Sequence, residues 1–262
     1  MNRLEVHLKA LKKQGVKGVI PYITAGDPCL DTTMKLLNIF KECGVPAVEL
    51  GVPFSDPLAD GVVNQRAAER ALKSGTTLRG ILERLENDKP EVPVILFTYY
   101  NPVFKIGLDQ FAVIAKKAGI SGILTLDLPV EEADEYVRIM KKNMIDVIFL
   151  IAPTSTQERI KRIVGLGSGF VYCVSRTGVT GVRSDVPGTV VPMVEKIRVE
   201  TDMPIAVGFG ISGPQQAKKV AQSADFVVVG SAIVRLIEQG GSSLDICQRV
   251  EDFTKELVRA VK

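Results

Sequence analysis

The chain has 262 residues, of which 46% are hydrophobic and 24% are charged, and its net charge is +3. Such a chain can bury a large core, and its length is close to the roughly 250 residues of a closed eight-fold strand-helix barrel. The small net charge argues against nucleic-acid binding, and the most hydrophobic windows are far shorter than the ~20 residues that span a bilayer.

The chain has four cysteines, and they show no spacing typical of metal ligands: Cys29, Cys43, Cys173 and Cys247. In a chain of this size they predict reduced, mostly buried thiols. The first five residues lack the charged and then hydrophobic layout of a signal peptide. We therefore expect a cytoplasmic protein that is neither secreted nor embedded in a membrane.

Short β-branched segments alternate with stretches of helical period along the chain. An amphipathic stretch at 4–14 comes first and predicts a helix that covers the bottom of a barrel. Eight strands are expected at 18–23, 47–50, 94–98, 122–126, 145–151, 170–174, 205–207 and 226–229. Helices are expected at 32–42, 63–72, 109–117, 132–142, 157–164, 190–199, 214–221 and 232–238, and a last helix at 243–261.

Strict alternation of strands and helices predicts a parallel sheet with the helices outside it. A closed barrel leaves no edge strand, whereas an open sheet of eight strands would leave two. No linker divides the chain. The predicted fold is α/β, a single (β/α)8 TIM barrel over residues 1–262 with an extra N-terminal helix and a C-terminal helix. Catalytic groups in such barrels lie where strands pass into the following loops.

A carboxylate occupies the second of these junctions. Ala47, Glu49 and Gly51 share one face of the strand, and this face of small residues predicts that Glu49 points into the barrel. Burial raises the pKa of a carboxyl group, and a pKa near neutrality suits general acid-base catalysis. The alternative is a Glu that pairs with a buried Arg or Lys, because charged residues are seldom buried unpaired.

The loop after this strand carries two more carboxylates and is stiffened by Pro53 and Pro57. Such a loop can arch over the barrel mouth and return Asp60 toward Glu49. Asp56 is more typical of a turn residue that bonds its own backbone.

Glycine-rich turns follow each of the last three expected strands, at 175–181, 208–212 and 230–231. Barrels often bind phosphate with the loops after strands seven and eight and with the N-terminus of a helix. Backbone N–H groups and the Ser231 hydroxyl would donate to the anion. The alternative is a set of tight turns without a ligand.

The remaining residue types exclude several chemistries. The only histidine is His7, in the N-terminal helix and far from every junction, so a catalytic transition-metal site is not expected. No lysine lies inside an expected strand, which argues against Schiff-base chemistry. What remains is acid-base chemistry by a carboxylate, on a phosphorylated substrate that supplies its own electron sink.

The segment 49–61 closely resembles the signature of the tryptophan synthase alpha-subunit family. Further matches lie at 21–28, 100–104, 175–181, 208–212 and 230–234, and the resemblance extends from about residue 17 to residue 236. It implies retro-aldol cleavage of indole-3-glycerol phosphate to indole and glyceraldehyde 3-phosphate. Glu49 would then move protons at C3 and at the side-chain hydroxyl. Asp60 would stabilise the positive charge that develops at the indole nitrogen.

The resemblance also implies a substrate pocket. Tyr172 and Thr180 would lie beside the substrate, with Thr180 in a lid over it. Phosphate would be held by Gly181, Gly210, Gly230 and Ser231. Tyr22, Phe209 and Leu126 could be walls for the indole ring or ordinary core residues. The pair Tyr99-Tyr100 departs from the family pattern of one Tyr followed by a small residue, and it affects the expected shape of the pocket.

The resemblance implies a partner as well, a pyridoxal-phosphate beta subunit that receives indole through a tunnel in an α2β2 complex. No cofactor is expected in this chain. The loop with Asp56 and Asp60 and the segment 100–104 are the expected contact surface. A stand-alone lyase and a catalytically silent regulatory subunit are the alternatives. An isomerase of a phosphoribosyl substrate would share the barrel and the phosphate site, but it would not explain the loop between Glu49 and Asp60.

Overall fold

The structure is a computed structural model that describes residues 3–174, 187–208 and 210–262. Parallel strands form one sheet in the order β5-β4-β3-β2-β1-β9-β8-β7-β6. Their bounds are β1 (Gly18–Thr24), β2 (Val48–Gly51), β3 (Val94–Thr98), β4 (Ile120–Thr125), β5 (Asp146–Ile148), β6 (Leu150–Ile151), β7 (Val171–Val174), β8 (Ile205–Gly208) and β9 (Phe226–Val229).

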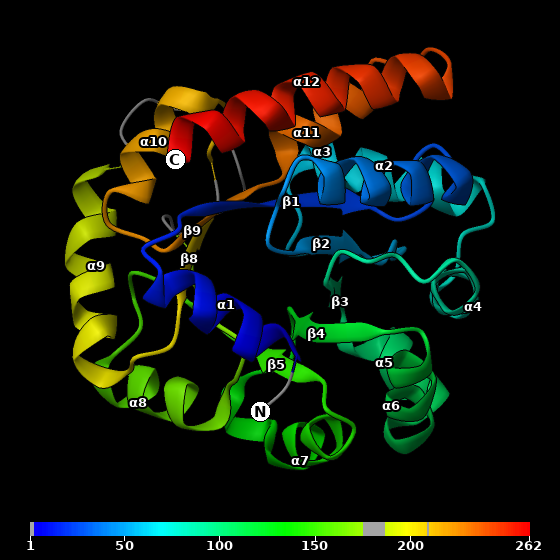
Figure 1. Ribbon diagram of the computed structural model, residues 1–262. Coiled ribbons are helices and arrows are strands. Elements are labelled where there is room, and N and C mark those ends of the chain that lie inside the picture. The colour runs from blue at the N-terminus through cyan, green and yellow to red at the C-terminus, as the bar shows by residue number, and fades with distance from the viewer. Residues whose placement is uncertain (1–2, 175–186, 209) are drawn as a thin grey trace.

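The sheet closes on itself at Phe149. β5 and β6 are the two ends of the strand order, and they are the two parts of the strand predicted at 145–151. The carbonyl of Phe149 accepts a bond from the Tyr172 N–H at 3.4 Å, which continues the pairing toward β7. The predicted closed barrel is therefore confirmed (Figure 1).

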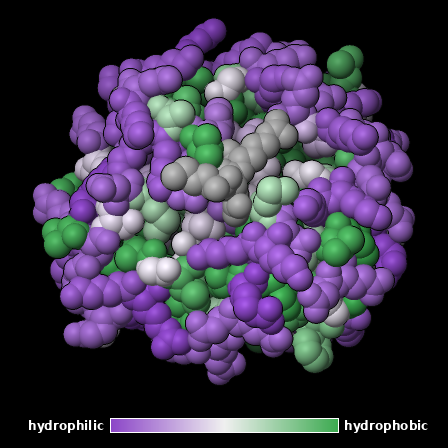
Figure 2. Space-filling view, turned by 60° about the horizontal axis from the view of Figure 1, so that its bottom comes forward, coloured by the Kyte–Doolittle hydropathy of each residue, from purple (hydrophilic) through white to green (hydrophobic). Residues whose placement is uncertain are grey.

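Helices surround the strands (Figure 1). In the part of the chain that the structure describes they are α1 (Arg3–Lys13), α2 (Leu30–Glu42), α3 (Val62–Lys73), α4 (Leu78–Asp88), α5 (Tyr100–Ile106), α6 (Leu108–Lys117), α7 (Asp134–Lys142), α8 (Gln157–Leu166), α9 (Pro187–Glu200), α10 (Pro214–Ala221), α11 (Ser231–Glu238) and α12 (Ser243–Val261), with a short 3-10 turn at Val130–Glu132. None of the described helices has the length and hydrophobicity needed to cross a bilayer. The face shown in Figure 2 is mainly hydrophilic, with separate hydrophobic patches.

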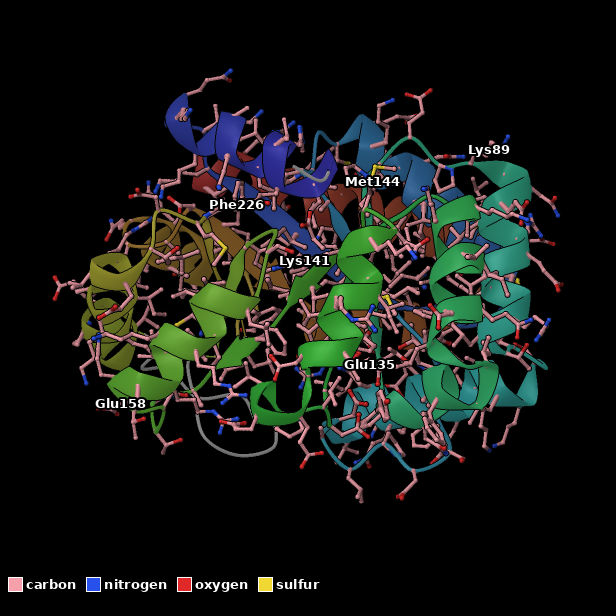
Figure 3. All side chains as sticks on the ribbon, turned by 90° about the horizontal axis from the view of Figure 1, so that it is seen from below. Lys89, Glu135, Lys141, Met144, Glu158 and Phe226 are labelled. Carbon is pink, nitrogen blue, oxygen red and sulfur yellow. The ribbon has the colours of Figure 1, made fainter. Side chains whose placement is uncertain are left out.

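Two of these helices, α4 and α5, are absent from the sequence-based prediction. In α4 the Thr77 side chain accepts from the Gly80 N–H at 3.1 Å and caps the helix. The helix ends at Asp88, and the next residue, Lys89, has a left-handed backbone with a φ of 46°. Figure 3 labels Lys89. The start of α5 is held by a distant residue, because the Tyr100 N–H donates to Asp127 Oδ1 at 2.6 Å. Such a long-range contact leaves no local sequence signal.

The core has an inner and an outer part. The outer part lies between strands and helices. The inner part fills the barrel and includes Phe170 and Phe226, and Figure 3 labels the latter. Leu4 and Leu8 of α1 belong to this inner part and are fully buried. They show that α1 covers the bottom of the barrel, as predicted.

Candidate active site

Glu49 lies inside the barrel. On β2 it is in register with Tyr22 of β1 and Ile95 of β3, and only 1% of it is exposed. Its Oε1 atom is buried and has no hydrogen-bond partner among the described residues. Burial alone raises the pKa of Glu49 to about 8. None of the ion pairs between described residues involves Glu49. The alternative that Glu49 is charged and pairs with a buried Arg or Lys is therefore not supported among these residues.

Two buried tyrosines lie near Glu49, and two glycines make room for them. A Cβ atom at Gly51 would lie 2.3 Å from Tyr22 Oη, and one at Gly208 would lie 2.4 Å from Tyr172 Oη. Burial raises the pKa of both phenols well above the ordinary value, and the charge of Glu49 adds to the effect at each. Both rings are therefore neutral neighbours of the Glu49 carboxyl at any pH near neutrality.

Asp60 lies in the loop between β2 and α3, and several groups fix its position. Tyr99 Oη donates to Asp60 Oδ2 at 2.9 Å and accepts from the Ala59 N–H at 3.0 Å. The side chain of Gln65 donates to the Asp60 carbonyl at 2.8 Å. Burial raises the pKa of Asp60, and hydrogen bonds from Tyr99 and Asn64 partly offset this rise. Asp56, in contrast, is exposed, and its carbonyl accepts from the Leu58 N–H in a turn.

A cavity at the carboxyl ends of the strands contains most of the expected site. It brings together six of the residues singled out in the sequence, namely Tyr22, Glu49, Tyr172, Gly210, Gly230 and Ser231. Asn64, Phe97, Ile211 and Val228 also line it. Asp60 is not part of this lining, but its charge contributes to the raised pKa of Tyr22, so it lies nearby.

The other expected residues lie elsewhere or cannot be placed. Leu126 lines a separate cavity together with Asp127 and Arg159, and it packs against the inner core. Thr180, Gly181 and Phe209 lie outside the described residues.

Sequence reasoning missed two residues, Tyr99 and Asn64. Tyr99 belongs to the pair that departs from the family pattern, and its position directly after β3 is the kind of junction where functional groups gather. Asn64 lies in the first turn of α3, one turn after Asp60. No local signal distinguished it from an ordinary helix residue.

One end of the cavity is formed by Gly210 and by the start of α11. Gly230 precedes α11, and Ser231 is its first residue. Gly210 has a φ of 83°, a conformation that side-chain-bearing residues rarely adopt. A helix N-terminus carries free N–H groups and a partial positive charge, so it is suited to an anion.

An ion-pair network holds α3 and α11 together beside this cavity. Arg70 of α3 donates through Nε and Nη2 to the buried Asp27, both at 2.8 Å, and through Nη1 to Glu238 of α11 at 3.0 Å. Arg66 donates to the same Glu238 carboxylate. The hydrogen bond from Arg66 is the main cause that lowers the pKa of Glu238 to about 2. The network therefore fixes the helix that follows Asp60 relative to the helix that begins at Ser231.

A closed barrel with a buried carboxyl and a helix N-terminus suited to an anion in one cavity is typical of a TIM-barrel enzyme of the acid-base type. Comparison with known proteins identifies the family. The family model described as tryptophan synthase alpha chain matches residues 8–262. The tryptophan synthase alpha chain of Solibacter usitatus is 49% identical over 261 residues, which cover 99% of this chain and 98% of the relative.

Solved structures agree with this result. A chain in the structure of Mycobacterium tuberculosis tryptophan synthase is 34% identical, with a TM-score of 0.89 and coverage of 99% of this chain and 98% of that one. A chain of the tryptophan synthase a2b2 complex of Pyrococcus furiosus is 38% identical, with a TM-score of 0.85 and coverage of 92% and 98%. The chain belongs to the tryptophan synthase alpha chain family. Its activity is the alpha reaction of tryptophan biosynthesis, the lyase cleavage of indole-3-glycerol phosphate.

Proposed function

We propose that Glu49 is the group that moves protons in this cleavage. The observation that carries the proposal is its buried, neutral carboxyl, whose Oε1 has no partner among the described residues and which lines the same cavity as Gly230 and Ser231. A general acid acts best when its pKa lies near the working pH. Burial gives Glu49 such a pKa, and no cation among the described residues pairs with it to lower the pKa again.

The proton steps balance with Glu49 alone. The neutral carboxyl gives its proton to C3 of the indole ring, which leaves a positive charge on the ring and a carboxylate on Glu49. The carboxylate then takes the proton of the side-chain hydroxyl. As the carbonyl of glyceraldehyde 3-phosphate forms, the bond to C3 breaks and its electron pair returns to the ring. Indole is released, and Glu49 is neutral again.

Asp60 is proposed to face the positive charge that develops at the indole nitrogen. Two donors, Tyr99 and Asn64, favour its ionised form against the effect of burial. A fixed negative charge near developing positive charge lowers the barrier, because little reorganisation is needed during the reaction.

The phosphate of the substrate is proposed to bind Gly210, Gly230 and Ser231. The N-terminus of α11 supplies N–H donors, and the Ser231 hydroxyl adds another. Gly181 and Thr180 are proposed to complete this end of the site and its lid. Tyr22, Tyr172 and Phe209 are proposed to contact the indole ring.

A beta subunit is the proposed partner, and it would carry the pyridoxal phosphate of the joint enzyme. The structure from Pyrococcus furiosus is described as showing mutual activation in an a2b2 complex. In the present chain large hydrophobic side chains are exposed at the active-site end of the barrel, among them Leu58 in the loop before Asp60 and Phe104 of α5. Exposed hydrophobic side chains at one end of a barrel suit a protein interface.

The test is to replace Glu49 by Gln, which keeps the shape but carries no transferable proton, and to replace Asp60 by Asn in parallel. Indole release is measured with a beta subunit present. We expect Glu49→Gln to lower the rate of cleavage at least a thousandfold, and Asp60→Asn to lower it about 100- to 1000-fold. Near-normal cleavage by Glu49→Gln would refute the proposed role.

The same assay separates the alternative functions. A stand-alone lyase would release indole at a rate that the beta subunit does not change. A silent regulatory subunit would bind the substrate without cleaving it, even in the complex. The proposed catalytic subunit cleaves the substrate, and the beta subunit accelerates the reaction.

A further inference from the structure

Two buried oxygen atoms in the cavity lack a hydrogen-bond partner among the described residues. One is Glu49 Oε1, which the proposed function uses. The other is Asn64 Oδ1 on the first turn of α3. A buried amide oxygen without a donor is unfavourable, because it has lost its hydrogen bonds to water and gained none in return. A second acceptor of this kind in the same cavity as Glu49 therefore indicates a ligand that supplies its donor.

The orientation of the Asn64 amide follows from its neighbour. The Asn64 side chain hydrogen-bonds to the carboxylate of Asp60. A carboxylate can only accept, so the NH₂ group of Asn64 must face Asp60. The opposite orientation would place two oxygens against each other. The Oδ1 atom is therefore the free end of the amide.

We propose that Asn64 is a further substrate-binding residue, whose Oδ1 accepts a hydrogen bond from an N–H or O–H group of the bound substrate. The inference rests on the proposed function of the cavity. Asn64 would thus connect the substrate with Asp60, because one end of its amide meets the ligand and the other donates to the carboxylate. It acts as a specificity-determining contact and transfers no proton itself.

The substrate carries donors of both kinds. The indole ring has an N–H group, and the glycerol chain has hydroxyl groups. A site that contains a buried acceptor discriminates against a ligand without the matching donor, because the acceptor is then buried without a partner. Asn64 is therefore expected to favour ligands with this donor over analogues of the same shape.

The test uses the complete chain in complex with a beta subunit. Asn64→Leu removes both polar ends at similar volume, and Asn64→Asp keeps an acceptor but loses the donor to Asp60. Asn143→Leu is the matched control, because Asn143 lies at the end of α7 and donates to the Ile139 carbonyl away from the cavity. The ligands are indole-3-glycerol phosphate, indole-3-propanol phosphate, which lacks the chain hydroxyls, and its N1-methyl form.

We expect Asn64→Leu to raise KM for the substrate about tenfold or more, and the control to leave it unchanged. If the donor is the ring N–H, Asn64→Leu weakens the binding of indole-3-propanol phosphate but not that of its N1-methyl form. If the donor is a hydroxyl, Asn64→Leu weakens the binding of the substrate alone. Asn64→Asp should lose more activity than Asn64→Leu, because it places a second carboxylate beside Asp60.

Wild-type affinity of Asn64→Leu for all three ligands, together with wild-type KM, would overturn the inference. This failure is distinct from failure of the proposed function. In the first case Glu49→Gln is inactive while Asn64→Leu behaves normally. In the second case Glu49→Gln itself retains cleavage.

Discussion

At the scale of single residues, the barrel interior determines the chemistry of Glu49. The sequence predicts correctly that this side chain points inward, because Ala47 and Gly51 share its face and the larger Val48 and Leu50 do not. The sequence does not reveal that no cation accompanies Glu49. That property depends on which residues of the other strands point at Glu49, and only the folded barrel brings these residues together.

The buried carboxyl makes the stability of the fold depend on pH. The folded chain holds the proton of Glu49 up to about pH 8, whereas the unfolded chain loses it near the ordinary pKa of 4.5. Stability therefore falls as pH rises through this window. We expect Glu49→Gln to stabilise the fold by about 4 kcal/mol at pH 8, with no difference below about pH 4.

Denaturant unfolding of both chains at pH 4, 6 and 8 measures this difference. The gap in the free energy of unfolding should widen from pH 4 to pH 8. A gap that is constant with pH, or a variant that is less stable at pH 8, would show that Glu49 is charged in the folded protein.

Tyr99 is a positioning residue for Asp60. Its hydroxyl bonds both the carboxylate and the Ala59 N–H, while its ring stacks on Phe54 with 5.1 Å between centroids. Tyr99→Phe keeps the ring and loses both hydrogen bonds. We expect kcat/KM to fall about tenfold. Because the lost bond lowers the pKa of Asp60 in the wild type, the acidic limb of the pH profile should move to higher pH.

The matched control for this variant is Tyr100→Phe. Tyr100 is the next residue in the chain, and its ring contacts Phe104 and Tyr136 rather than Asp60. The control should keep the wild-type acidic limb. An unshifted limb in Tyr99→Phe would mean that its hydroxyl does not act on Asp60.

At the scale of elements, strands are predicted from sequence better than the helices between them. Buried strands are continuous hydrophobic segments, and all were found within a few residues of their bounds. The hydrophobic spacing of Leu78, Ile81, Leu82 and Leu85 is that of a helix, and all four are buried. α4 was missed because the expected repeat has one helix after each strand. α5 depends on the contact with Asp127, which the sequence cannot show.

The N-terminal helix stabilises the barrel from below. Leu4 is fully buried, and a Cβ at Gly122 would lie 2.8 Å from its Cδ2 atom, so the glycine makes room for it. The Glu5 N–H donates to the buried Asp146 at 3.1 Å. We expect Leu4→Ala to lower the free energy of unfolding by about 2–4 kcal/mol, because it leaves a cavity in the inner core.

Val6→Ala serves as the control on the same helix, because Val6 is 48% exposed. Its effect should stay within about 0.5 kcal/mol. Urea unfolding of the wild type, Leu4→Ala and Val6→Ala measures both changes in the free energy of unfolding. Equal, small losses for Leu4→Ala and Val6→Ala would show that α1 does not contribute to the core.

At the scale of the whole molecule, the fold places the candidate site at the carboxyl ends of the strands. Closure of the barrel brings residues from β1, β2, β7 and the last two loops into one cavity. The sequence predicts this position of the site, because the active sites of TIM barrels lie in the loops that follow the strands. It also predicts that the loop after β2 returns Asp60 toward Glu49, and Asp60 does lie near the cavity. It could not predict that Tyr99 holds the Asp60 carboxylate there, because this depends on the course of one loop.

The exposed side chains at this end are expected to meet the beta subunit. We expect Phe104→Asp to weaken binding of the beta subunit at least tenfold, because a charge replaces a side chain that is 63% exposed. Val199→Asp is the control on α9, where Val199 is 81% exposed. Titration calorimetry with the beta subunit measures the affinity of each variant. If Phe104→Asp binds the beta subunit as tightly as Val199→Asp does, Phe104 does not belong to the proposed interface.

The central claim is that neutral Glu49 gives a proton to the substrate, and the pH profile of kcat/KM tests it most directly. This ratio reports the ionisation of the free enzyme. With the beta subunit present, we predict that kcat/KM for indole-3-glycerol phosphate falls tenfold per pH unit above an apparent pKa of about 8, as Glu49 loses its proton. A profile that stays level or rises from pH 7 to pH 10 would contradict the claim.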